Sequence, residues 1–100
     1  MTSDPELLQG LKTQSEKAIY EVYTSFYPAV EKYILVNSGS AQDAEDIFQD
    51  TVMVLLNYIA KDGFTLTASI KTFVFAIARR LWLKQLRYRS KTETLLEIEV

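Results

Sequence analysis

Residues 40–60 read SAQDAEDIFQDTVMVLLNYIA, and the apolar positions in this stretch recur at the spacing of an α-helix. At 100° per residue, one side of that helix collects the residues that we expect in the core: Ala44, Ile47, Phe48, Thr51, Val52, Leu55, Tyr58 and Ile59. Ser40 and Asp43 have the spacing of a capping box, which predicts that the helix begins there.

Two more helices are predicted before this stretch. Between residues 18 and 34, apolar side chains return every three or four positions: Ile19, Val22, Tyr23, Phe26, Val30, Tyr33 and Ile34. Pro28 lies inside this pattern and has no backbone N–H to donate, so we expect the helix to kink or restart there. Upstream, Asp4 and Pro5 are typical of a helix start, which predicts a short extra helix with Leu7, Leu8 and Leu11.

The helix predicted from residue 70 to about residue 88 has apolar residues on two sides. One stripe consists of Ile70, Phe73, Val74, Ile77, Leu81 and Tyr88. The other stripe consists of Phe75, Trp82 and Leu86. We favour a central helix that is packed on both sides, and the alternative is that the second stripe is a surface for a partner.

The composition indicates one small all-α domain. Of the 100 residues, 48% are hydrophobic, and three Gly and two Pro provide few turns for a β-fold. We expect a compact bundle of three main helices over residues 18–90, after an N-terminal lead-in of residues 1–17 and before a linker that starts within residues 91–100. No stretch is long and apolar enough to predict a membrane span, and the absence of cysteine agrees with a cytoplasmic location.

The residue types argue against an enzyme. The chain has no Cys and no His, which excludes thiolate nucleophiles, imidazole bases and ordinary zinc sites. We therefore predict no catalytic residues, no cofactor and no metal. An enzyme that uses carboxylates such as Asp43 and Asp46 is a third possibility, although both are expected in a solvated first turn of a helix.

The net charge of −2 is unevenly distributed. Residues 1–68 have four basic and ten acidic side chains, residues 69–91 have seven basic and no acidic ones, and residues 92–100 have three acidic ones. The basic segment also carries aromatic residues, a combination that suits single-stranded nucleic acid. The alternative is a solvated helix face that offsets its acidic neighbours.

A polar face lies opposite the core side of the helix in residues 40–60. It consists of Asp46, Gln49, Asp50, Met53 and Asn57. Carboxylates around a methionine can pair with basic side chains and offer a deformable apolar contact, which indicates a protein-docking face. The alternative is an ordinary polar surface.

Several of these segments together resemble region two of bacterial extracytoplasmic-function sigma factors. The resemblance rests on two runs, DAEDIFQDT at residues 43–51 and SIKTFVFAIARR at residues 69–80, and on Phe26, Tyr27, Pro28 and Tyr33 upstream. It spans residues 18–89, most of the chain.

The resemblance implies a promoter-recognition domain that binds core RNA polymerase and helps it to open DNA. In that family the outer face of the second helix binds the clamp helices of the largest polymerase subunit, a role that would fall to Asp46, Gln49, Asp50, Met53 and Asn57. The following loop and helix engage the non-template single strand of the −10 element, with one base flipped out. The residues expected on that DNA surface are Lys61, Phe64, Thr65, Thr67, Lys71, Arg79, Arg80, Lys84, Arg87 and Arg89.

The chain departs from the family pattern at three positions. The family often has Trp at Phe73, Asn at Arg80 and Asp at Lys84, so its base preference does not transfer to this chain. A complete member has a second helical domain, region 4, which this sequence does not include, so we expect either a truncated chain or an isolated domain, which would bind promoter DNA weakly. The alternative function is a sigma-like interaction domain, in which an exposed stripe of Phe75, Trp82 and Leu86 binds an anti-sigma factor or a second copy.

Overall fold

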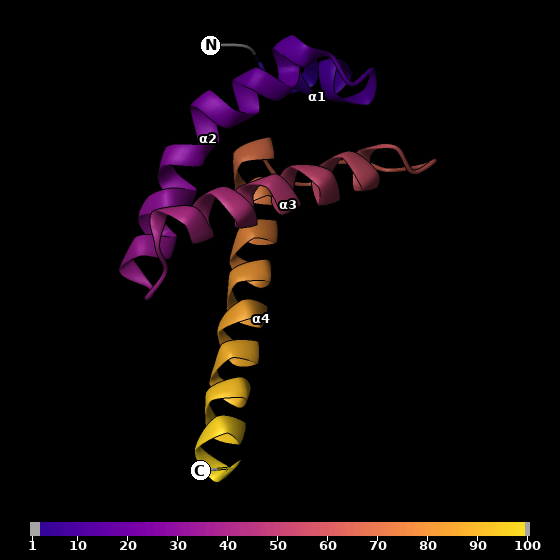
Figure 1. The fold of residues 1–100 in the computed structure, drawn as a ribbon. Helices are drawn as coiled ribbons and strands as arrows, with labels where there is room; N and C mark the ends of the chain where they lie inside the picture. The colour runs from indigo at the N-terminus through magenta and orange to yellow at the C-terminus, as the bar shows by residue number, and fades with distance from the viewer. Residues whose placement is uncertain (1–2, 100) are drawn as a thin grey trace.

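The computed structural model describes residues 3–99 of the chain, and the side chains of residues 3–92. This part of the chain forms four helices and no strand: α1 (Asp4–Lys12), α2 (Glu16–Val36), α3 (Ala41–Ile59) and α4 (Ile70–Glu99). Figure 1 shows α3 crossing in front of α4, with α2 to the left of α4 and α1 beside the beginning of α2. The predicted all-α bundle is confirmed, including the short N-terminal helix.

A serine precedes each of the four helices. The hydroxyl oxygens of Ser3, Ser15, Ser40 and Ser69 each accept a hydrogen bond from the backbone N–H three residues later. At α3 the capping box is complete, because the Asp43 carboxylate also accepts from the Ser40 N–H at 2.8 Å. These side chains satisfy N–H groups that have no partner inside the helix, so each helix has a defined start.

Trp82 of α4 lies at the centre of the bundle. Its side chain is fully buried, and its indole Nε1–H donates to the Asn37 carbonyl at 3.0 Å. On one side of α4, Phe75 packs edge-on against Tyr33 of α2. On the other side, Phe73 packs edge-on against Tyr58 of α3. The helix is therefore central, and the alternative of an exposed second stripe is wrong because Trp82 has no exposed surface.

The N-terminal residues pack against the same core. Leu7 and Leu11 of α1 are buried, and a Cβ added to Gly10 would lie 2.8 Å from the Cβ of Ala18. Glycine at this position permits the close approach of α1 to α2. The second helix continues without a break through Pro28, so it does not restart there.

The fourth helix is longer than its apolar pattern predicts. It runs 30 residues to Glu99 instead of ending near residue 88, and its second half extends away from the other helices in Figure 1. No Gly or Pro occurs between residues 70 and 99 to stop the helix. The backbone of residues 91–99 is thus helical, the start of a linker in these residues stays a prediction, and residue 100 lies outside the described residues.

Candidate functional site

The acidic face of α3 is exposed along its whole length. We use this name for the five residues predicted to dock a protein: Asp46, Gln49, Asp50, Met53 and Asn57, all of which are exposed. The Met53 side chain is 63% exposed. The Asp46 Oδ1 accepts a hydrogen bond from the Gln42 Nε2 at 2.9 Å, within the same helix. The acids therefore lie on the surface, and the buried positions of α3 are those predicted for its core side.

A hollow beside the acidic face joins one of its residues, Gln49, to α2. It has a volume of about 270 Å³ and is lined by Tyr23, Tyr27, Glu45 and Gln49. The Tyr27 hydroxyl donates to the Glu31 Oε2 at 3.2 Å, and burial together with this carboxylate raises the pKa of Tyr27 to about 12. Tyr23 belongs to the apolar pattern of α2, which indicates the core, and Tyr27 entered only through the family resemblance, so neither residue was predicted to line a surface hollow.

The loop between α3 and α4 is anchored by two apolar side chains. Phe64, which was expected on the DNA surface, and Leu66 are half-buried against the core, and the Phe64 ring centroid lies 5.8 Å from that of Phe73. Thr65 and Thr67 are exposed between and after these anchors. Lys61 is also exposed, with its Nζ 4.9 Å from the centre of the Tyr58 ring. The loop thus keeps its predicted polar residues at the surface while its backbone is held by apolar contacts.

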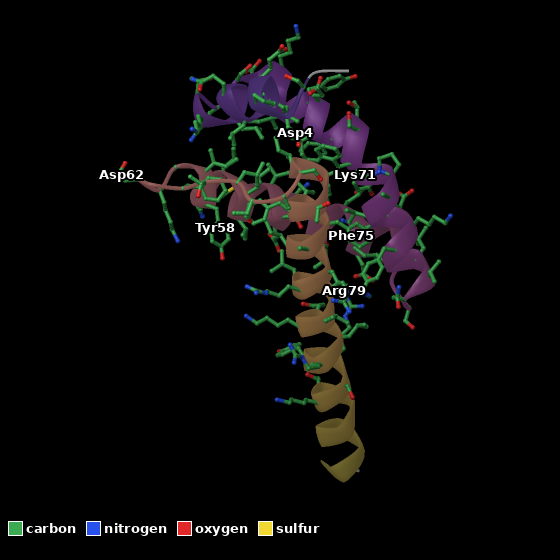
Figure 2. All side chains as sticks on the ribbon, turned by 180° about the vertical axis from the view of Figure 1, so that it is seen from behind. Asp4, Tyr58, Asp62, Lys71, Phe75 and Arg79 are labelled. Carbon is green, nitrogen blue, oxygen red and sulfur yellow. The ribbon has the colours of Figure 1, made fainter. Side chains whose placement is uncertain are left out.

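The basic residues of α4 do not all share one side. Arg80, Lys84, Arg87 and Lys91 are spaced by four, three and four residues, so they form a row within an arc of about 60°. All four are exposed, and we call them the basic row. Lys71 and Arg79 are exposed on other sides of the helix. Figure 2 shows Arg79 and Phe75 on the side of α4 that faces α2, opposite Tyr58.

Arg89 is a partly exposed basic residue that also joins two helices of the fold. Its guanidinium donates two hydrogen bonds to the Asp43 carboxylate, at 2.6 and 3.2 Å, and lies 5.3 Å from the Trp82 ring centre. The Arg89 guanidinium, with help from the Ser40 N–H, holds the pKa of the Asp43 carboxyl well below its usual range. A DNA contact by Arg89 stays a prediction, and it would have to leave room for this ion pair.

A pocket between α3 and α4 lies between the loop and the basic row. This α3–α4 pocket has a volume of about 320 Å³ and is lined by Val54, Tyr58, Phe73, Ala76, Ile77, Arg80 and Leu81. Phe73 connects it to Phe64 of the loop, and Arg80 is the first member of the basic row. A second hollow of about 320 Å³ lies further along α4, where Asp50 of the acidic face and Lys84 of the basic row share a wall.

The described residues contain no arrangement suited to a metal or a carboxylate enzyme. Within them, no group of three Asp, Glu, His or Cys side chains could hold a metal ion. The Asp43 carboxylate accepts from the Ser40 N–H and pairs with Arg89, whereas Asp46 is exposed and accepts from Gln42. Among the same residues, no helix is both long and apolar enough to cross a membrane.

Comparison with known proteins identifies the family. The family model for Sigma-70 region 2 matches residues 22–92, which include α3, the loop and the first 23 residues of α4. No curated protein and no solved structure matches the chain. Domains of this family are transcription factor domains without catalytic activity, and in general they bind core RNA polymerase and recognise the −10 promoter element. With more than two thirds of its length matched, the chain belongs to the sigma-70 region 2 family.

Proposed function

We propose that this domain is region 2 of an extracytoplasmic-function sigma factor and that it divides its two tasks between α3 and α4. The acidic face of α3 docks on core RNA polymerase in the bacterial cytoplasm, and the loop with the basic row of α4 holds the non-template strand. The observation that carries this proposal is the exposure of two surfaces of opposite charge on adjacent helices of a family member.

Docking through the acidic face follows from its chemistry. Exposed carboxylates at Asp46 and Asp50 can accept charge-assisted hydrogen bonds from arginine or lysine of a partner. Met53 adds an exposed, flexible apolar contact between them and Asn57. The partner that we propose is the coiled coil of clamp helices in the largest polymerase subunit, which the family resemblance implies.

Capture of a single strand follows from the combination of charge and aromatic surface. Arg80, Lys84 and Arg87, together with Lys91, present four cations in line for the phosphates of one strand. At the end of this row, the α3–α4 pocket offers two aromatic rings to an unstacked base. Lys61, Thr65 and Thr67 lie in the adjoining loop. Lys71 and Arg79 lie on other sides of α4, so they would contact the DNA strand only if it bends around the helix.

Charge reversal of the acidic face tests the docking role. The double variant Gln49→Lys/Asp50→Lys is expected to lower the affinity for core polymerase at least tenfold, because each new cation would face basic groups of the partner. Its thermal unfolding midpoint should change little, since both side chains are exposed. Polymerase affinity is measured by fluorescence anisotropy of the labelled domain.

The matched control is Glu16→Lys, which reverses an exposed charge at the beginning of α2. It should keep wild-type affinity for polymerase and lose only a few tenths of a kcal/mol of stability from the helix dipole. Unchanged polymerase binding by the Gln49→Lys/Asp50→Lys variant would refute the docking assignment.

The alternative function as an interaction domain loses the surface on which it depended. Trp82 is fully buried, Phe75 rests on Tyr33, and Leu86 is half-buried. No continuous stripe of these three residues is available for an anti-sigma factor or a second copy. The acidic face and the basic row, in contrast, are both exposed, which supports the proposed division of tasks.

A further inference from the structure

The α3–α4 pocket contains one charged side chain among apolar and aromatic walls. Val54, Ala76, Ile77 and Leu81 form the aliphatic part, and the rings of Tyr58 and Phe73 lie 5.6 Å apart at an angle of 66°. Its volume of about 320 Å³ lies at the lower end of the range for small-ligand sites, about 300 Å³ upwards. A flat aromatic ligand with polar edges fits such a pocket better than an aliphatic one does.

Arg80 is available to a ligand at this pocket. Its side chain is exposed, and among the described residues no carboxylate lies within 4.0 Å of its guanidinium. This differs from Arg89, whose guanidinium is held by Asp43. A guanidinium has five N–H donors and no acceptor, so its preferred ligand edge carries two neighbouring acceptors.

We infer that Arg80 makes the α3–α4 pocket selective for guanine, an inference that rests on the proposed capture of a single strand. Guanine presents N7 and O6 side by side, and both accept from one guanidinium. Adenine replaces O6 by an amino group, which would meet the donors of Arg80, and thymine presents O4 beside a methyl group. The rings of Tyr58 and Phe73 then contact the purine, while Arg80 reads its edge.

The position of Arg80 at the start of the basic row supports the proposed selectivity for guanine. Lys84 and Arg87 follow it on the same side of α4, so phosphates of the strand can lie along the helix while one base enters the pocket. Arg80 can distinguish one base from another only if it contacts the base itself and not only the phosphates. Lys84 serves as the comparison, because as a row member away from this pocket it should contribute to affinity without distinguishing one base from another.

The test measures binding of the full chain to single-stranded oligonucleotides by fluorescence anisotropy, with and without core polymerase. The oligonucleotides are dT strands that carry one central dG, dA or dC. The dG strand is expected to bind about tenfold more tightly than the dA strand, at the lower end of the discrimination of a bidentate contact. Arg80→Ala should abolish this preference, and so should Arg80→Lys, which keeps the charge but loses the planar fork.

The control variant Lys84→Ala should weaken binding to every oligonucleotide by a similar factor and keep the preference for dG. Circular dichroism checks that each variant is folded, which is expected because both side chains are exposed. A preference for dC, whose O2 and N3 also accept, would overturn the inference. Equal binding of all strands, or a dG preference that survives Arg80→Ala, would overturn it as well. Failure to bind any strand, even with polymerase, would instead contradict the proposed function.

Discussion

At the scale of single residues, the pairing of Arg89 with Asp43 gives a structural contact to a side chain that the sequence placed on the DNA surface. The bidentate contact joins the beginning of α3 to the middle of α4, and the same guanidinium covers the ring of Trp82. Asp43 also completes the capping box with Ser40, so one carboxylate serves both a helix start and a contact between helices. A contact of Arg89 with DNA would have to compete with this arrangement.

The Asp43 pair predicts a loss of stability in acid. The pKa of Asp43 is lowered in the folded chain from an ordinary value of 3.8, chiefly by Arg89, so the stabilisation is present above that pH and disappears as the pH falls below it. Asp43→Asn should flatten the dependence of the unfolding free energy on pH below about 4. Urea unfolding at several pH values measures this dependence. Asp46→Asn is the control, and an equal flattening by both variants would contradict the role of the pair.

At the scale of elements, α1 stabilises the beginning of the helix that carries the basic row. The Asp4 Oδ2 accepts a hydrogen bond from the Ile70 N–H at 3.1 Å, across 66 residues of sequence. Beside this bond, a hollow of about 450 Å³ is lined by Pro5 and Leu8 of α1 and by Phe64 and Leu66 of the loop, among others. The predicted lead-in therefore supports the loop that we propose to contact DNA.

Removal of this contact should loosen the start of α4. In Asp4→Ala the Ile70 N–H loses its acceptor, which is expected to cost about 1 kcal/mol of stability, as for other helix caps. Amide hydrogen exchange should become faster at Ile70 and in the loop of residues 60–69, and Asp4→Asn, which keeps an oxygen acceptor, should have a smaller effect. Glu6→Ala, at an exposed position of the same helix, is the control. Unchanged exchange at Ile70 in Asp4→Ala would show that the bond is not formed in solution.

At the scale of the whole molecule, the charges are separated although the net charge is only −2. The acidic face lies on α3 and the basic row on α4, two helices that cross in Figure 1. An unwound strand can lie along one helix while a protein covers the other. Asp50 of the acidic face and Lys84 of the basic row line one hollow together.

Because the basic row and the acidic face lie on different helices, we expect that substitutions in the basic row impair DNA binding and leave polymerase binding intact. Lys84→Glu/Arg87→Glu should weaken binding to single-stranded DNA and reduce the slope of log affinity against log salt by more than one, because two phosphate contacts are removed. The same variant should bind core polymerase normally. Titrations at several salt concentrations provide the slope, and an unchanged value would remove Lys84 and Arg87 from the DNA surface.

The amino-acid sequence alone determined the helices and the exposure of the acidic face. Periodicity and capping act between residues a few positions apart, so Ser40 and Asp43 indicate a helix start without knowledge of the rest of the fold. The predicted end of α4, near residue 88, lies before its real end at Glu99. The apolar pattern stops near residue 88, but no Gly or Pro follows that would end the helix.

Only the tertiary structure decided which residues far apart in the sequence are in contact. Arg89 reaches Asp43 across 46 residues, Asp4 reaches Ile70 across 66, and Trp82 is buried because α2 and α3 pack on both sides of α4. These contacts depend on how helices pack, and many packings satisfy the same local pattern. For that reason, seven basic residues in one segment separate into an exposed row, two residues on other sides and one structural ion pair.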